Sequence, residues 1–357
     1  MLIISHEIFS NLELMETSAE RNNIRNHSEV FPTQYSVLSS AAIGDHISHH
    51  YGLKILNCRL LIHNVGDTYL LVAETEKYIF KVYRDAHRSL NEIKAELELL
   101  QALYSGGAKV ARPLPDLKAD LIQAFNAAEG KRFGVLFAYA HGAVHSDLTQ
   151  EQLITVGREM AVIHNISASV ELSYARPEYN IETTLHYPLK VIQADFESMK
   201  EEYAFLKSTC DKLIKRMADF DLTKFSYGYC HYDYLPKNFH FQHDGSVTFF
   251  DFDFAGKGHY VNDFASVYAH FFLNVIFNKM TQEEADRDFK TFLDAYKTVR
   301  PISEEEIKAI PYFGFAWWMF YFGFHHDNFE DWSNFFYHSR FIRERVGWLR
   351  KWAEWYL

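Results

Sequence analysis

The 357-residue chain contains few cysteines, only Cys58, Cys210 and Cys230. Their number is odd, their spacing is wide, and no Cys-x-x-Cys pair occurs. This pattern argues against a disulfide framework and against a zinc site. Unpaired thiols are typical of a reducing compartment, so we expect a cytoplasmic protein whose cysteines are buried and inert.

The chain also lacks an excess of basic residues and lacks a long apolar run. It has 36 Lys and Arg against 47 Asp and Glu, which gives a net charge of −11. No basic stripe is visible, and this argues against a nucleic-acid partner. The longest aromatic run, Tyr312 to Phe324, is shorter than the roughly 20 apolar residues that span a bilayer. We therefore predict neither a nucleic-acid nor a membrane partner.

The most informative segment lies between residues 230 and 253. It places His231, Asp233 and Asn238 in a His-x-Asp-x-x-x-x-Asn pattern, and a β-branched and aromatic strand then ends at Asp251. A kinase-type phosphoryl-transfer site needs one aspartate at the acceptor hydroxyl. It also needs an asparagine and a second aspartate to hold Mg²⁺ on the ATP phosphates. The Asp244-Gly245 turn signal before the strand fits this order. The segment predicts an ATP-dependent kinase.

This stretch resembles the aminoglycoside phosphotransferase-like superfamily, which includes type II homoserine kinases and choline kinases. The resemblance implies that Asp233 is the catalytic base and that Asn238 and Asp251 are Mg²⁺ ligands. It further implies that His231 supports the loop and that Asp263 steadies it.

Two features depart from related patterns. Tyr232 stands where the family usually has glycine and where protein kinases have arginine. Asp251 is followed by Phe252 and Asp253, so Asp-Phe-Gly is absent, and no Ala-Pro-Glu follows. These absences weigh against a eukaryotic-type protein kinase. Asp253 matches a position that is often acidic in the family, and its role stays open.

The first half of the chain predicts an ATP-covering sheet. In kinases a hairpin covers the phosphates, and the third strand carries a lysine. We expect Gly66, Asp67 and Thr68 in the first turn to contact the nucleotide, although a plain hairpin turn would look the same. Lys81 lies in the third strand, and the downstream motif favours phosphate binding over a solvent-facing position. The expected strands include residues 59–62, 69–73 and 77–83.

A helix is expected over 88–103, because Ile93, Leu97 and two further leucines recur at helical spacing. A kinase needs a glutamate on this helix to fix the lysine. Glu96 flanks the apolar face and precedes Leu-x-Leu-Leu as the family glutamate does, so we predict that it pairs with Lys81. A solvated charge on an exposed face is the alternative.

The predicted fold class is α+β, a protein-kinase-like fold with two lobes. A small antiparallel sheet lobe with one key helix precedes a larger, mostly helical lobe. We expect an N-terminal extension over 1–34, the ATP-covering lobe over 35–138, and the lobe with the catalytic loop, metal site and acceptor site over 139–357. In the second lobe, His164 is expected to be a packed core histidine.

The acceptor is the least determined part of the prediction. The family uses its last helices as a wall of the acceptor site, and the helical segment after Ser303 is very aromatic. An aromatic face beside acids is suited to an amine, although simple helix packing gives the same pattern. We favour a small-molecule kinase that acts on an amino alcohol or an aminoglycoside. An atypical bacterial Ser/Thr protein kinase and a nucleotide-binding pseudokinase are the alternatives. The polar residues beside the aromatic run are His325, His326, Asp327, Glu330 and Asp331.

Overall fold

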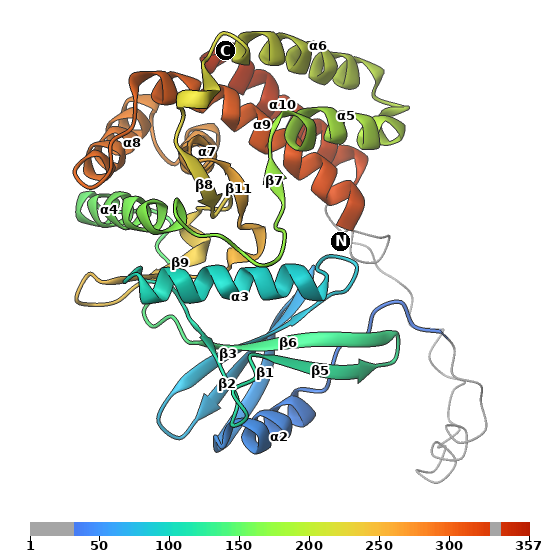
Figure 1. Cartoon of the computed structure of the whole chain (residues 1–357). Coiled ribbons are helices and arrows are strands. Elements are labelled where there is room, and N and C mark those ends of the chain that lie inside the picture. Colours follow the sequence, from blue (N-terminus) through green and yellow to red (C-terminus); the bar gives the residue numbers. More distant parts are fainter. Residues whose placement is uncertain (1–31, 329–336) are drawn as a thin grey trace, which may run out of the picture.

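The computed structural model describes residues 32–328 and 337–357, so most of the expected extension, and Glu330 and Asp331, lie outside the described residues. An antiparallel sheet forms one lobe and a mostly helical assembly forms the other, with helix α3 (Leu90–Ser105) lying between them (Figure 1). The expected α+β kinase-like class is confirmed. Within the described ranges, no helix is long and apolar enough to cross a membrane.

The sheet lobe has the strand order β1-β2-β3-β6-β4, with β5 paired to β6, and all of these pairs are antiparallel. The first hairpin is tighter than expected. Gly66, Asp67 and Thr68 belong to a strand and not to the turn, because they pair with Tyr83, Val82 and Lys81. The strands are β1 (Ile55–His63), β2 (Gly66–Ala73), β3 (Lys77–Tyr83), β4 (Pro113–Leu114), β5 (Ile122–Ala127) and β6 (Gly130–Ala138).

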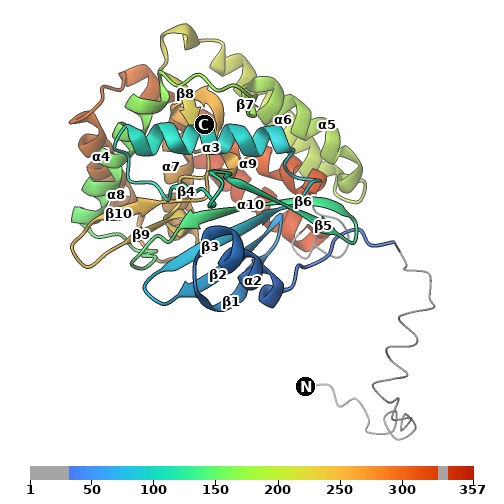
Figure 2. The same ribbon diagram turned by 60° about the horizontal axis from the view of Figure 1, so that its bottom comes forward.

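Helices cover both faces of this sheet. Helix α2 (Ser40–Tyr51) starts four residues later than the sequence pattern indicates, where Ser39 caps it. It buries Ile43 and Ile47 against β2 and β3 in a core of its own (Figure 2). Helix α3 begins with a capping box formed by Ser89 and Glu92. Its leucines join the core of the helical lobe, so this helix links the two lobes.

The second lobe is built around α7 and α9, which pack against each other. Its helices are α4 (Gln150–Ser167), α5 (Tyr187–Val191), α6 (Lys200–Met217), α7 (Val261–Ile276), α8 (Gln282–Lys297), α9 (Glu304–Asn328) and α10 (Ser339–Tyr356). Single-turn helices are η1 (Glu182–His186), η2 (Ile192–Phe196), η3 (Leu222–Lys224), η4 (Pro236–Asn238) and η5 (Phe252–Phe254).

Short strands position the catalytic segment between these helices. Strands β7 (Glu178–Tyr179), β8 (Tyr227–Cys230) and β11 (Gly256–His259) form one small sheet, and β9 (Phe239–Phe241) and β10 (Val247–Phe249) form a hairpin. Gly245 has φ +82° in the hairpin turn, as the Asp-Gly signal predicts. The loop that contains Asp233 therefore leaves β8, and Asp251 follows the end of β10.

Candidate active site

Asp233 lies at the centre of the loop between β8 and β9, and its side chain is almost fully buried. Its Oδ2 accepts hydrogen bonds from Asn238 Nδ2 at 2.8 Å and from Lys237 Nζ at 2.8 Å. Its Oδ1 accepts a hydrogen bond from the hydroxyl of Tyr321 at 2.9 Å. The structure thus brings together Asp233 and Asn238, and it adds Lys237 and Tyr321.

Hydrogen bonds to α7 fix the backbone of this loop. Asp263, in the first turn of α7, accepts hydrogen bonds from the backbone N–H groups of His231 at 3.0 Å and Tyr232 at 2.6 Å. The Tyr232 carbonyl accepts a bond from the indole of Trp317 at 2.8 Å. These contacts hold Tyr232 at φ +68°, a backbone conformation that non-glycine residues seldom adopt. Glycine, usual in the family at this position, would adopt it without strain.

His164 completes the support beneath the loop. Its Nε2 lies 2.9 Å from Asp263, and its Nδ1 lies 3.0 Å from the hydroxyl of Tyr296. Burial lowers the pKa of His164 although the Asp263 carboxylate opposes that shift, which favours the neutral form of the ring. It is the packed core histidine that the sequence predicts. His231 Nε2 lies 3.1 Å from the Phe250 carbonyl and ties the loop to the segment that carries Asp251.

Asp251 is half-exposed, with φ +61°, and its carboxylate lies 3.0 Å from Lys81 Nζ. Asp253 lies 3.6 Å from the same ammonium group. Burial raises the pKa of the Asp251 carboxyl group, but the charge and hydrogen bond of Lys81, together with the charge of Lys237, bring it below its ordinary value. The predicted lysine and the predicted metal aspartate therefore meet across the two lobes.

Glu96 points from α3 into the space between the lobes and is buried. The Tyr83 hydroxyl donates to its carboxylate at 3.1 Å, and Arg176 lies 4.0 Å from it. Burial raises the pKa of Glu96, although Lys81 acts in the opposite direction. Lys81 pairs with the two aspartates and not with Glu96 in this structure, so the predicted Lys81–Glu96 clamp stays a prediction.

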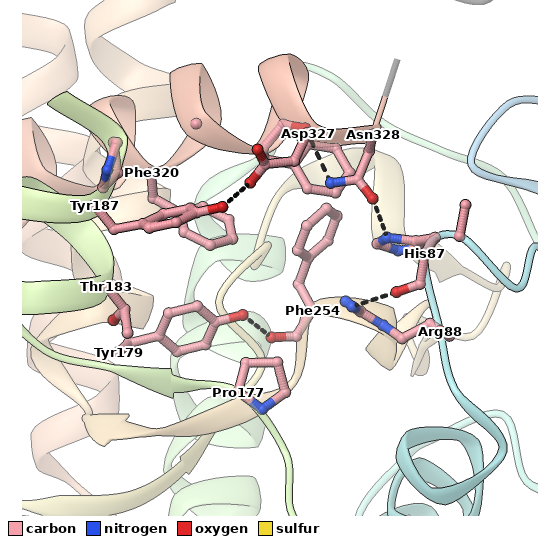
Figure 3. Close-up of a pocket in the computed structure, with 14 residues that line it drawn as sticks. His87, Arg88, Pro177, Tyr179, Thr183, Tyr187, Phe254, Phe320, Asp327 and Asn328 are labelled. Atoms are coloured by element: carbon pink, nitrogen blue, oxygen red, sulfur yellow. Dashed lines mark hydrogen bonds between the residues drawn. The ribbon is translucent and has the colours of Figure 1, made fainter. Parts of the chain in front are cut away.

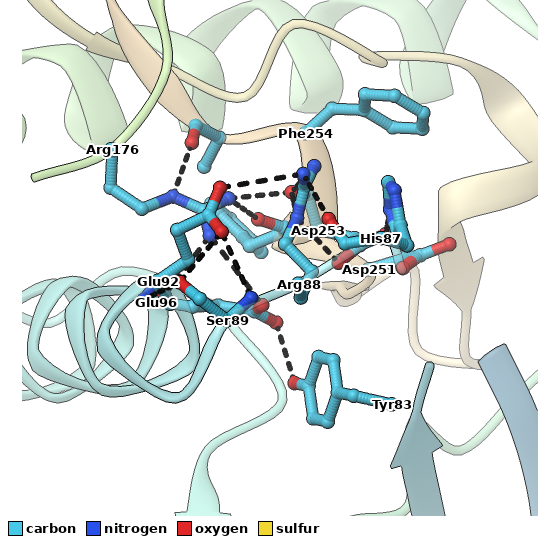
Figure 4. A network of polar contacts seen from close by, with 12 residues as sticks. Tyr83, His87, Arg88, Ser89, Glu92, Glu96, Arg176, Asp251, Asp253 and Phe254 are labelled. Atoms are coloured by element: carbon cyan, nitrogen blue, oxygen red, sulfur yellow. Dashed lines mark hydrogen bonds and ion pairs between the residues drawn. The ribbon is translucent and has the colours of Figure 1, made fainter. Parts of the chain in front are cut away.

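Asp253 joins a buried ionic network that the sequence pattern does not reveal (Figure 4). Its carboxylate lies 2.6 Å from His87 Nε2 and 3.3 Å from Arg88 Nε. Arg88 and Arg176 also donate to its backbone carbonyl, at 2.7 and 2.5 Å. The network holds the start of α3 against the segment that follows Asp251. No local periodicity marks Arg176, because it lies between regular elements.

Gly66, Asp67 and Thr68 do not all lie on the same face of the sheet. Thr68 and Gly66 lie opposite Lys81 and Tyr83 across the β2–β3 pair, so they share the face toward the second lobe. Asp67 points to the other face, where its fully buried carboxylate binds Arg132 at 3.1 Å, Tyr35 at 2.8 Å and His63 at 2.7 Å. The side chain of Asp67 is thus occupied within the sheet lobe. The Asp67 carboxylate is therefore not available for the predicted contact with the nucleotide.

The oxygen donors of Asn238 and Asp251 suit a hard cation. The Asn238 amide nitrogen is used by Asp233, which leaves its Oδ1 for a ligand. The described residues contain no group of three or more His, Cys, Asp and Glu side chains that could hold a metal ion. A site with few protein ligands fits Mg²⁺, which keeps several waters and binds substrate phosphates.

A cavity of about 350 Å³ lies between α5, α9 and the segment before α3 (Figure 3). Phe254, which follows Asp253, lines it, whereas Asp233, Asn238 and Asp251 do not. Phe and Tyr rings make up five of the cavity's fourteen lining residues, and His87 and Arg88, both paired with Asp253, also line it. Asp327 supplies a carboxylate to it and accepts a 2.8 Å hydrogen bond from Tyr187. Tyr321, which holds Asp233, packs against three of the lining rings. The expected polar residue His326 instead pairs with Asp195 at 2.7 Å. The aromatic lining residues are Tyr179, Tyr187, Phe254, Phe320 and Phe324.

A family model described as "Phosphotransferase enzyme family" matches residues 62–302, which include Lys81, Glu96, Asp233, Asn238 and Asp251 but none of the site residues on α9. The chain belongs to this phosphotransferase family. The expected enzyme class, a kinase, is thereby confirmed. The match begins in β1 and ends before α9. The pocket wall formed by α9 therefore lies outside the matched region.

Similar proteins and solved structures cover most of the chain. An uncharacterized protein of Synechocystis is 28% identical over 295 residues, 81% of this chain and 79% of that protein. An amicoumacin kinase, solved with AMP-PNP, Ca²⁺ and Ami, has a TM-score of 0.68 at 19% identity and covers 87% of this chain and 94% of its own. A microcompartment-associated aminopropanol kinase has a TM-score of 0.68 at 20% identity, and the match covers 88% of this chain and 95% of that kinase. These structures share the fold.

Proposed function

We propose that this enzyme transfers the γ-phosphoryl group of ATP, bound with Mg²⁺, to a hydroxyl of a small molecule that carries an amine. The observation that carries the proposal is the convergence on one point of a buried carboxylate and a metal-type donor pair. Asp233 and Asn238 are joined at 2.8 Å, and Lys81 reaches Asp251 at 3.0 Å. A nucleotide-binding pseudokinase has no need for the base.

Each group has a role in this reaction. Asp233 accepts the proton of the acceptor hydroxyl, and Tyr321 holds that carboxylate in one orientation. Lys81 binds the α- and β-phosphates, and Glu96 fixes Lys81 once the nucleotide separates it from Asp251. Asn238 and Asp251 hold Mg²⁺, which neutralises charge on the phosphates. Gly66 and Thr68 present the face of β2 to the nucleotide, and the fold's likeness to a kinase solved with AMP-PNP supports ATP as the donor.

The cavity beside Tyr321 is the acceptor site in this proposal. Its aromatic rings and the Asp327 carboxylate suit an ammonium group through cation–π and ionic contacts. The similar structures include kinases named for amicoumacin and aminopropanol. A cavity of about 350 Å³ fits a small molecule better than a protein segment, which weighs against a Ser/Thr protein kinase. An amino alcohol and an aminoglycoside are both compatible with it.

We also place this reaction in the cytoplasm, the compartment that supplies ATP. The three cysteines are free, and Cys210 and Cys230 are buried, in keeping with a reducing environment.

The test is ADP release in the presence of Mg²⁺ and ATP, measured across amino alcohols, choline analogues, aminoglycosides and a generic protein substrate. The Asp233→Asn variant is assayed beside the wild type. We expect turnover on a small amine-bearing alcohol, and we expect its loss in the variant while ATP binding is retained. Turnover on the protein substrate alone, or activity that survives Asp233→Asn, would refute the proposal.

A further inference from the structure

Lys237 places a positive charge beside the base Asp233. It follows the base by four residues, at the centre of the single-turn helix η4 that begins only at Pro236, and its Nζ is 2.8 Å from Asp233 Oδ2. The Lys237 side chain is 59% exposed, whereas that of Asp233 is only 3% exposed. The lysine therefore lies at the boundary between the buried base and solvent.

The position of Asp233 does not depend on this lysine. Tyr321 holds Oδ1 and Asn238 holds Oδ2, and both partners come from structured elements. Lys237 balances the charge of the buried Asp233 carboxylate, and loss of one partner from a pair with a buried member leaves that charge uncompensated. Because the lysine side chain is itself largely exposed, a bound substrate can also reach its ammonium group.

The surrounding charges indicate what Lys237 does. The charges of Lys237 and Asp251 attract each other, and Lys81 contacts the Asp251 carboxylate directly at 3.0 Å. Lys237 contacts the base itself, and in the proposed reaction the phosphoryl group must come within bonding distance of the hydroxyl that this base deprotonates. Asp233, Asp251 and the phosphoryl oxygens are all anionic. A fixed cation at this point stabilises the charge that spreads over the phosphoryl oxygens in the transition state.

We propose that Lys237 is a catalytic residue that contacts the transferring phosphoryl group, an inference that rests on the proposed kinase function. When substrates bind, its ammonium turns from Asp233 Oδ2 toward a γ-phosphoryl oxygen. A bond forms between the acceptor oxygen and the γ-phosphorus. The bond from that phosphorus to the β–γ bridging oxygen breaks, and its electron pair stays on ADP. The acceptor proton passes to Asp233 and then to solvent, while Lys237 stays protonated throughout.

Three variants test this role. Lys237→Met removes the charge, Lys237→Arg keeps it, and Lys290→Met removes a lysine that forms a similar i,i+4 pair with Asp294 on the surface of α8. We expect Lys237→Met to lower kcat by about 100-fold, the lower end for loss of one transition-state donor. The affinity for Mg²⁺–ADP is expected to stay unchanged. Lys237→Arg should recover most of the rate, and Lys290→Met should match the wild type.

A second measurement separates contact with the phosphoryl group from orientation of the base. Affinity for ADP with tetrafluoroaluminate and the acceptor, which imitates the transition state, is measured by calorimetry for each variant. We expect Lys237→Met to lose this affinity in proportion to its loss of kcat. An unchanged affinity with reduced kcat, or an unchanged kcat, would overturn the role of Lys237 alone. Absence of ATP-dependent turnover in the wild type would overturn the proposed function, and this role with it.

Discussion

The hydroxyl of Tyr321 donates a 2.9 Å hydrogen bond to Oδ1 of Asp233, and this bond joins α9 to the catalytic loop. Burial and the adjacent Asp233 raise the pKa of Tyr321 well above its ordinary value, so the hydroxyl keeps the proton that it donates. The neighbouring residue Phe320 lines the cavity. The base and the proposed acceptor site are therefore positioned by the same helix.

We predict that Tyr321→Phe lowers kcat about 10-fold and leaves the KM for ATP unchanged. The variant keeps the ring packing but loses one hydrogen bond to a charged group, a loss of roughly 1.5 kcal/mol. Steady-state kinetics check this result. Tyr312→Phe is the control, because Tyr312 lies on the same helix and contacts Arg216, away from Asp233. Equal effects of the two variants would mean that the Asp233 contact has no catalytic role.

We predict that Asp263→Asn lowers the free energy of unfolding by about 2–4 kcal/mol and lowers kcat as well. Asp263 is fully buried and accepts hydrogen bonds from two backbone N–H groups and from His164. An asparagine turns one acceptor atom into a donor that faces another donor, which is costly in a buried site.

Urea denaturation measures the effect of Asp263→Asn, with Asp221→Asn as the control. Asp221 lies on the surface, where its carboxylate bonds to Thr223 and Lys224. The control should change stability by less than about 0.5 kcal/mol. If Asp263→Asn were equally mild, the loop would not depend on this carboxylate.

The buried ring of His164 gives a prediction for the pH dependence of stability. Burial lowers the pKa of His164 in the folded chain below the ordinary value of 6.5, which applies to the unfolded chain. At a pH between the folded and the unfolded pKa, the unfolded chain therefore binds more protons at this group than the folded chain does. The free energy of unfolding therefore falls as the pH falls below about 6.5. In His164→Gln this contribution is absent, and we expect a smaller loss between pH 7.5 and 5.5. Urea denaturation at both values checks this, and a steeper loss in the variant would contradict it.

The parts of the site that the sequence predicts are those with a local pattern. Asp233, Asn238 and Asp251 are fixed by the spacing of one loop and one hairpin, and Lys81 is fixed by its strand. The sequence does not show on which face of the sheet the Asp67 side chain lies, so its actual contacts could not be predicted. Its partner Arg132 is 65 residues away in the chain, and only strand pairing brings the two together.

The residues that the sequence analysis missed have the same physical cause. Tyr321 reaches Asp233 across 88 residues, and Arg176 reaches Asp253 across 77. Each lies in a segment whose pattern only indicates helix packing or an irregular connection. The overall fold was predictable because sheet hairpins and capped helices have local signals. The long-range contacts within each lobe were not, since they depend on how distant elements pack.

Asp251 and Asp253 offer a matched pair of variants that separates metal binding from structure. The Asp251 side chain is 46% exposed and pairs with Lys81, whereas the Asp253 side chain is 4% exposed and is surrounded by His87, Arg88 and Lys81. We predict that Asp251→Asn raises the Mg²⁺ concentration needed for half-maximal rate at least about 10-fold, because one anionic ligand is lost. Its free energy of unfolding should stay nearly unchanged.

Asp253→Asn should leave the Mg²⁺ requirement nearly unchanged and lower the free energy of unfolding by about 3 kcal/mol. The loss arises because the buried Arg88 guanidinium loses its counter-charge. The measurements are ADP release as a function of Mg²⁺ concentration, and urea denaturation without nucleotide. Chelation with EDTA should abolish wild-type turnover, and added Mg²⁺ should restore it. If Asp253→Asn alone raised the Mg²⁺ requirement, the two aspartates would have exchanged roles, and Asp253 would be the metal ligand.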